Sequence, residues 1–216
     1  ILMINEYEIN LSLGELLRAF PKIWMKKDKE YLKSFFYSLF KTNVYSVGSG
    51  SDALFIILKD IEKDIGKGEI ICSNYSCKAI PRTIIKAGFD PVFVDIDEKL
   101  SLDITQVKKA ISKKTKAILI YHPWGFAHNV NIFGLGHKKG ILIIEDCARG
   151  MGSIKGKEFG SFGNYSFFSF RTGKLINAGS GSILLSKKGM ENKSKSYPKI
   201  LSLMNLFDLI FRKIIN

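Results

Sequence analysis

The sequence contains no uninterrupted apolar run of about 18 residues or more, the length that a membrane-spanning helix needs. We therefore expect no membrane span and no membrane partner. The first residues, 1–5, form a very short apolar stretch without a basic leader, so we expect no secretory signal. These features predict a cytoplasmic protein.

Cysteine and histidine are scarce, with three of each among 216 residues. Cys72 and Cys77 are five positions apart, and no His-x-x-x-His pair lies near them, so the zinc spacings are missing. We expect no metal site. The cysteines, including Cys147, are expected to be reduced and partly buried, as is usual in the cytoplasm.

Arginine is also rare. Lysine and arginine together number 33 against 20 acidic residues, which gives a net charge of +13, but only five of the 33 are arginines. Nucleic-acid sites favour arginine for bidentate contacts, and no nucleic-acid motif is visible. We therefore expect no nucleic-acid partner. Salt-dependent binding of an anionic polymer remains an alternative that the charge alone supports.

The chain is rich in apolar residues (46%) and aromatic residues (12%), which is typical of a globular protein. From residue 43 onward, short apolar runs alternate with amphipathic segments. Because continuous apolar runs separated by helices indicate a buried parallel sheet, we predict an α/β, three-layer sandwich with a mostly parallel seven-stranded sheet. The last two strands have no helix between them, so at least one antiparallel pairing is expected there. The expected strands are 44–47, 69–72, 91–95, 117–121, 141–144, 165–170 and 182–185, with helices at 51–63, 76–87, 103–112 and 129–138.

Two flanking segments differ from this central region, 41–186. Residues 1–40 have helical periodicity in two apolar runs separated by Pro21, which predicts an N-terminal helical arm. Aromatic side chains there could instead pack on a partner subunit. Residues 187–216 combine a polar linker with an amphipathic helix at 198–215. That helix is expected to pack on protein, and a helix lying on a membrane surface is the alternative.

Ligands of open α/β sheets bind beyond the carboxyl ends of the strands, and three informative segments fall there. The turn with Ser49, Gly50 and Ser51 follows the first strand and begins a helix, where free N–H groups and the helix dipole attract anions. A plain helix cap is the alternative reading of this turn. Asp146 follows the fifth strand, and Lys174 follows the sixth in a glycine-rich turn.

Lys174 and Asp146 together have a chemical meaning that neither has alone. A lysine amine forms a Schiff base with an aldehyde cofactor, and apolar surroundings free that amine by lowering its pKa. A carboxylate beside the pyridine nitrogen of pyridoxal phosphate keeps that nitrogen protonated, which makes the ring an electron sink. The pair therefore predicts a pyridoxal phosphate site.

Seven segments with consistent spacing resemble the pyridoxal phosphate-dependent sugar aminotransferases of the DegT/StrS type, which have fold type I. The resemblance covers about residues 42–186, is much weaker in 1–40 and is absent after 187. The segments are 48–54 (GSGSDAL), 70–76 (IICSNYS), 88–96 (GFDPVFVDI), 115–118 (TKAI), 121–125 (YHPWG), 144–148 (IEDCA) and 160–170 (GSFGNYSFFSF), which is followed by Lys174.

The resemblance implies a role for each matching residue. Lys174 would be the Schiff-base lysine, and Asp146 the partner of the pyridine nitrogen. Tyr75 would stack on the cofactor ring. The remaining cofactor contacts would be Ser49, Gly50, Ser51 and Ser169 near the phosphate and Arg149 near the phenolic oxygen.

The resemblance also implies the reaction and the assembly. An amino donor, expected to be glutamate, would give its amino group to a nucleotide-linked keto sugar in a ping-pong reaction. The product would be an amino sugar for a polysaccharide or a secondary metabolite. The active form would be a homodimer. Because family members continue into a small C-terminal domain, the chain is expected to be the large domain with that small domain missing.

Several residues depart from the family pattern. Arg149 stands where the family usually has glutamine, and the other departures are Arg171, Gly173, Ser180 and Ser182. They leave the choice of substrate open. One alternative is a truncated, non-catalytic relic or a binding module that keeps the fold. A related sugar dehydratase is a weaker alternative, because those enzymes replace the lysine with histidine.

Overall fold

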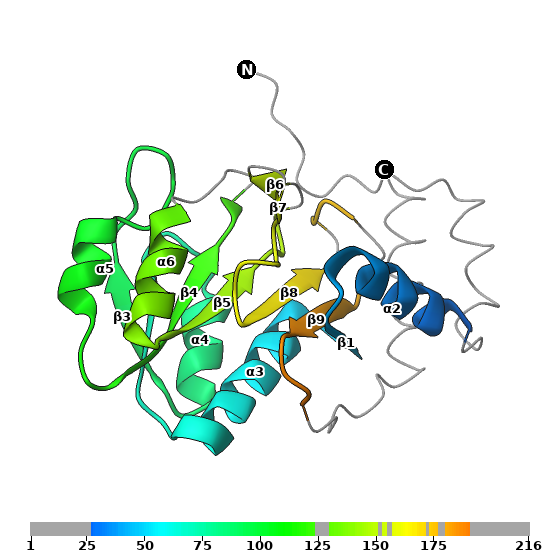
Figure 1. Cartoon of the computed structure of the whole chain (residues 1–216), viewed down its shortest axis with the longest axis horizontal. Coiled ribbons are helices and arrows are strands. Elements are labelled where there is room, and N and C mark those ends of the chain that lie inside the picture. The colour runs from blue at the N-terminus through cyan, green and yellow to red at the C-terminus, as the bar shows by residue number, and fades with distance from the viewer. Residues whose placement is uncertain are drawn as a thin grey trace, which may run out of the picture.

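The structure, a computed structural model, describes residues 27–123, 130–150, 153–154, 157–171, 173–176 and 180–190. Its main element is a seven-stranded sheet (Figure 1). The strands are β1 (Asn43–Val47), β2 (Glu69–Ser73), β3 (Asp90–Val94), β4 (Thr115–Tyr121), β5 (Leu142–Asp146), β8 (Tyr165–Ser169) and β9 (Ser182–Ser186). All seven predicted strands are confirmed, with ends that differ by one or two residues.

The strand order is β1-β9-β8-β5-β4-β2-β3. Strand β9 is antiparallel to both of its neighbours, and the other neighbouring pairs are parallel. The expected antiparallel pairing of the last two strands is therefore confirmed. As a consequence, the carboxyl ends of β1, β4, β5 and β8 lie at one edge of the sheet.

Five helices are described: α2 (Lys27–Phe40), α3 (Gly50–Ile65), α4 (Ala79–Lys86), α5 (Ile104–Ala110) and α6 (Val130–Lys139). Helix α5 begins where Asp103 accepts hydrogen bonds from the backbone N–H groups of Thr105 and Gln106. Helix α4 begins at residue 79, three positions later than predicted. The reason is a turn in which the Ser73 hydroxyl accepts from the N–H of Tyr75 and the Ser76 hydroxyl donates to the Ser73 carbonyl.

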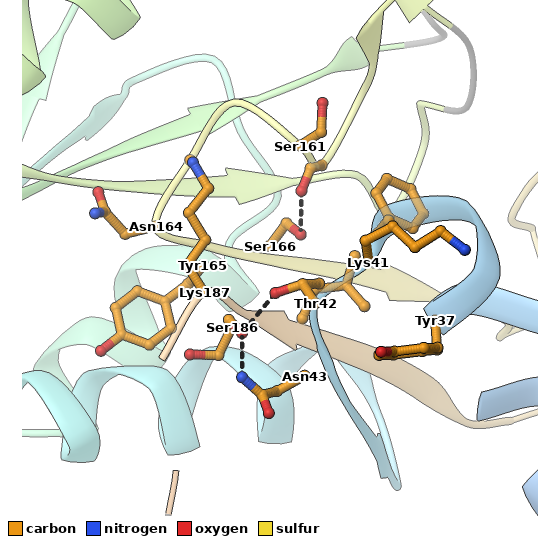
Figure 2. A pocket seen from close by; sticks show the side chains of 14 residues that line it. Tyr37, Lys41, Thr42, Asn43, Ser161, Asn164, Tyr165, Ser166, Ser186 and Lys187 are labelled. Atoms are coloured by element: carbon orange, nitrogen blue, oxygen red, sulfur yellow. Dashed lines mark hydrogen bonds between the residues drawn. The ribbon is translucent and has the colours of Figure 1, made fainter. Parts of the chain in front are cut away.

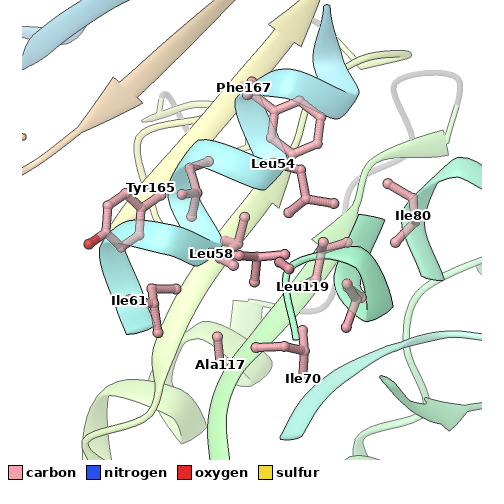
Figure 3. Packing of buried hydrophobic residues seen from close by; sticks show 14 of the residues in the cluster. Leu54, Leu58, Ile61, Ile70, Ile80, Ala117, Leu119, Tyr165 and Phe167 are labelled. Atoms are coloured by element: carbon pink, nitrogen blue, oxygen red, sulfur yellow. The ribbon is translucent and has the colours of Figure 1, made fainter. Parts of the chain in front are cut away.

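The helices cover both faces of the sheet, which confirms the three-layer architecture. Helices α3 and α4 pack on one face, and Figure 3 shows Leu54 and Leu58 of α3 directed toward Phe167 of β8 and Leu119 of β4. Helices α5 and α6 pack on the opposite face. Alternation along each strand assigns the faces, so Phe167 faces α3 while Phe168 faces the other way.

Helix α2 is the described part of the predicted N-terminal arm. It packs on the face opposite α3, where the ring of Phe36 lies 5.1 Å from that of Phe168 and 6.2 Å from that of Phe170. Phe35 and Tyr37 of the same helix are exposed. The first apolar run of the arm and the predicted helix at 198–215 lie outside the described residues.

A small hairpin, β6 (Ser153–Ile154) and β7 (Lys157–Glu158), precedes β8 and was not predicted. Its two-residue strands are too short to give a periodic pattern. Among the helices that the structure describes, none is long and apolar enough to cross a membrane.

Candidate active site

The turn after β1 and the end of β8 are brought together at the carboxyl edge of the sheet. A methyl group added at Gly50 would lie 3.4 Å from Cβ of Ser169 and 3.5 Å from the ring of Phe167. These are ordinary van der Waals distances, so the turn at Gly50 lies directly against the end of β8. The structure therefore places Ser49, Gly50 and Ser51 beside Ser169, four of the residues that the sequence proposed for cofactor binding.

Ser49 is the N-cap of α3. Its hydroxyl oxygen accepts from the backbone N–H of Asp52 at 3.2 Å and donates to the Asp52 carboxylate at 2.8 Å. The side chain of Ser49 is thus engaged in capping. Within the described chain, the N–H groups of Gly50 and Ser51 have no acceptor, as is usual for the first turn of a helix. These two N–H groups and the exposed hydroxyl of Ser51 are available to an anion.

Asp146 is the last residue of β5, and its side chain is only 4% exposed. One carboxylate oxygen, Oδ1, accepts from the N–H of Ala148 at 2.9 Å. Burial raises the pKa of Asp146 to about 6, although the Ala148 N–H and the charges of Lys174 and His122 oppose the rise. This carboxylate is therefore costly to keep ionised until a cationic partner reaches it.

Lys174 is half-buried in the turn that follows β8, where its backbone N–H donates to the Arg171 carbonyl at 3.1 Å. Burial lowers the pKa of the Lys174 amine, the charge of Asp146 opposes this, and Arg149 lowers the pKa further. The sequence prediction of a partly desolvated amine is confirmed. Since Lys174 and Asp146 each contribute to the pKa of the other, the structure brings them into one site.

Two further residues belong to this site and were not singled out from the sequence. Tyr121 ends β4 and stands opposite Asp146 in the register of β4 and β5. Burial, together with the charge of Asp146, raises the pKa of Tyr121 to about 12. Cys77 is exposed and lies between β2 and α4, near enough to Tyr121 and Lys174 for a thiolate there to raise the pKa of both. The rule that sites form at strand ends could have found Tyr121. Nothing in the local sequence around Cys77 indicates its position.

The two remaining predicted contacts lie around the same groups. Tyr75 is 47% exposed and follows β2. It lies near enough to Tyr121 for a phenolate at position 75 to raise the Tyr121 pKa. Arg149 is partly buried in the turn after β5, and its charge lowers the pKa of both Tyr121 and Lys174. All eight predicted site residues therefore lie at strand ends, or in the turns and the helix start that follow them, at the carboxyl edge.

Behind Asp146, on the opposite face of the sheet, lies a buried polar network. The carboxylate of Glu145 accepts from the N–H of Gly160 at 3.0 Å and of Gly163 at 2.6 Å, and it lies 3.0 Å from Nε2 of His122. Because an ionised carboxylate only accepts hydrogen bonds, Nε2 of His122 carries the hydrogen. No pattern in the sequence predicts this contact.

Potential metal ligands gather in the same network, since ligand atoms of His122, Glu145 and Cys147 lie within 4.8 Å of one another. All three side chains are buried. Both oxygens of the Glu145 carboxylate already accept backbone hydrogen bonds, Oε1 from Gly163 and Oε2 from Gly160. We therefore interpret the cluster as a hydrogen-bond network that supports the end of β5.

Comparison with known proteins identifies the family. Residues 23–197 match the DegT/DnrJ/EryC1/StrS aminotransferase family. The GDP-perosamine synthase of Vibrio cholerae is 32% identical over 194 residues, which are 85% of this chain and 53% of that protein. A UDP-N-acetyl-3-dehydro-alpha-D-glucosamine 3-aminotransferase of Acidithiobacillus ferrooxidans is 37% identical over 134 residues, or 60% of this chain and 36% of that protein.

A solved structure with the same fold is a GDP-4-keto-6-deoxymannose-3-dehydratase with a trapped PLP-glutamate geminal diamine. It is 25% identical, with a TM-score of 0.74, and the match covers 84% of this chain and 51% of that one. The chain thus spans about half the length of the relatives that it matches. On the matched residues, the chain belongs to the DegT/DnrJ/EryC1/StrS aminotransferase family, whose cofactor is pyridoxal phosphate.

Proposed function

We propose that this chain is the cofactor-binding part of an aminotransferase that transfers an amino group from an amino acid to a nucleotide-linked keto sugar. The observation that carries the proposal is that the Lys174 amine and the buried Asp146 carboxylate lie at the same edge of the sheet, near enough for each charge to act on the pKa of the other. When bound, pyridoxal phosphate supplies an aldehyde that holds amines and a ring that withdraws electrons.

The chain's own residues have distinct tasks in this proposal. The Lys174 amine holds the cofactor, is released when the donor arrives, and then moves the proton at the donor's α carbon. The Asp146 carboxylate holds the proton on the pyridine nitrogen. A pKa of about 6 leaves this carboxylate mostly ionised at neutral pH, and an ion pair with the pyridinium would stabilise the ionised form further.

The phosphate is assigned to the N–H groups of Gly50 and Ser51 and to the hydroxyls of Ser51 and Ser169. Their position at the start of α3 supports this assignment, because the helix dipole and free N–H groups favour an anion there. Ser49 contributes by capping α3 and so fixing the turn. The ring of Tyr75 is assigned to one face of the cofactor.

Charge favours anionic substrates. The charges of Arg149 and Arg171 lower the pKa of the Lys174 amine, and the Asp146 carboxylate opposes them. This excess of positive charge suits the carboxylates of an amino acid and the phosphates of a nucleotide sugar. Glutamate is proposed as donor because a structural neighbour holds PLP-glutamate, and the sugar because the relatives are named for sugar substrates.

The assembly is proposed to be a cytoplasmic homodimer. The exposed Leu175 and Ile176 follow Lys174 directly, at 63% and 46% exposure, and two large apolar side chains at the margin of a site are suited to contact with a second subunit. A mass measurement of the native protein with and without pyridoxal phosphate tests this assembly.

The function is tested by incubating the purified protein with pyridoxal phosphate, glutamate and a GDP- or UDP-linked keto sugar. The proposal predicts a visible cofactor absorbance band that glutamate bleaches and an aminated sugar detected by mass. A band that persists unchanged in Lys174→Ala would refute the assigned lysine. Loss of water from the sugar without amination would support the dehydratase alternative, and cofactor binding without turnover would support a binding module.

A further inference from the structure

A cavity of about 320 Å³ opens at the sheet edge opposite the candidate active site (Figure 2). Because β9 is antiparallel to β8, Ser186 pairs with Tyr165 at the start of β8, whereas Ser182 pairs with Ser169 at the other end. The walls come from the end of α2, the start of β1, the loop 160–164 and the end of β9. The volume lies at the lower end of the range for small-molecule sites.

The cavity wall is positively charged. Its lining residues include Lys41 and Lys187 but no aspartate or glutamate, and Figure 2 shows these two lysines on opposite sides of the cavity. Nζ of Lys187 donates to the Phe162 carbonyl at 3.3 Å. Among the residues that the structure describes, neither lysine has a carboxylate within ion-pair distance. Such a surface favours an anion.

Hydrogen bonds tie the strands of the wall together, and some of its polar side-chain groups still have hydrogens to donate. The side chains of Thr42 and Asn43 donate to the Ser186 carbonyl at 2.7 and 3.2 Å, which ties β1 to β9. Oδ1 of Asn164 accepts from the N–H of Ile143 at 2.8 Å, which leaves the amide hydrogens of Asn164 as donors. The hydroxyl of Ser186 is buried, and no hydrogen-bond partner is found for it in the described part of the chain.

The loop 160–164 connects this cavity to the candidate active site. The same loop that forms one wall donates the N–H groups of Gly160 and Gly163 to Glu145. Glu145 precedes Asp146 in β5, and its carboxylate contacts the His122 side chain. The backbone N–H of His122 donates in turn to the Asp146 carbonyl at 3.0 Å. A ligand that fixes or moves the loop therefore acts on the residues directly behind Asp146.

We propose that this cavity is a second binding site, for one small anion carrying phosphate or carboxylate groups, and that its occupancy alters cofactor binding at Asp146 through Glu145. The first half is independent of the proposed function. The second half rests on it, because it assumes that the cofactor contacts Asp146.

Calorimetric titration tests the site, with inorganic pyrophosphate as the phosphate probe and citrate as the carboxylate probe. The protein is loaded with pyridoxal phosphate so that the turn after β1 is already occupied, and the cofactor-free Ser51→Ala variant is titrated in parallel. We expect Lys41→Met/Lys187→Met to weaken the binding of at least one probe by about tenfold or more, which corresponds to about 1.4 kcal/mol. Which probe binds more tightly identifies the anionic group.

The matched control is Lys138→Met/Lys139→Met, which removes the same charge from exposed positions at the end of α6. This control should leave binding unchanged. Equal weakening in both double variants would overturn the proposal, because it would mean that the net charge attracts anions without a site. Unchanged binding in Lys41→Met/Lys187→Met would overturn it as well.

The link to the cofactor is tested by measuring pyridoxal phosphate affinity with and without saturating probe. We expect a change of about fivefold, as is common for coupled sites, and its loss in Lys41→Met/Lys187→Met. Probe binding without any change in cofactor affinity would refute the link while the site stands. A protein that binds the probe but no cofactor would refute the proposed function alone.

Discussion

At the scale of single residues, Asp146 shows how a candidate active-site group opposes stability. Its carboxylate is buried in the cofactor-free protein, and burial raises its pKa from 3.8 to about 6. The folded protein therefore binds more protons than the unfolded chain between these values, so this residue's contribution to stability is present below pH 4 and is lost as the pH rises through about 6.

We predict that Asp146→Asn stabilises the cofactor-free protein at pH 7.5 by up to roughly 3 kcal/mol and changes stability little at pH 4. The same substitution should lower cofactor affinity and activity, because the neutral amide cannot hold the pyridinium proton. Denaturant unfolding at the two pH values checks the first effect, and absorbance titration checks the second. An equal change in stability at both pH values would contradict this account.

Ser49 and Ser51 are two residues apart, and we expect different roles for them: Ser49 a structural one and Ser51 one in cofactor binding. The Ser49 hydroxyl caps α3, so Ser49→Ala should destabilise the protein by about 1 kcal/mol. The exposed hydroxyl of Ser51 has no hydrogen-bond partner within the described chain, so Ser51→Ala should leave the unfolding free energy unchanged while weakening pyridoxal phosphate binding. Unfolding curves and cofactor titrations of both variants would show the reverse pattern if the roles were exchanged.

At the scale of elements, aromatic packing holds α2 to the sheet, and Phe36 is joined there by Phe40, whose ring lies 5.6 Å from that of Phe168. Phe36 is 1% exposed and packs on Phe168 and Phe170, whereas the neighbouring Phe35 is 49% exposed. We predict that Phe36→Ala costs about 3–5 kcal/mol in unfolding free energy and that Phe35→Ala costs far less. Chemical denaturation of the two variants makes the comparison. Similar losses from both would indicate that Phe35 is buried against a partner in solution.

The elements also show what the sequence could and could not predict. The seven strands were predictable because buried strands are continuous apolar runs, and simple alternation along β8 accounts for Phe167 and Phe168 lying on opposite faces. The start of α4 was wrong because serine side chains in the turn 73–76 replace helical hydrogen bonds. The contact between His122 and Glu145 could not be predicted, since it depends on how two strand ends align.

At the scale of the whole molecule, the two edges of the sheet have different properties. The carboxyl edge gathers Lys174, Asp146 and the turn at Gly50, while the opposite edge holds the cavity between Lys41 and Lys187. The first assembly could be expected from sequence because parallel strands bring their ends together. The second could not, because it is formed by the start of β1, the end of β9 and a loop that have no common motif.

The direct test of the account is to treat the protein with pyridoxal phosphate, reduce it with borohydride and locate the added mass by peptide mapping. We predict that the phosphopyridoxyl group is found on Lys174 at stoichiometric levels and that Asp146→Asn lowers its yield. The many exposed lysines should carry only traces. Label distributed evenly over those lysines, or unchanged in amount when Lys174 is replaced by alanine, would contradict the central claim.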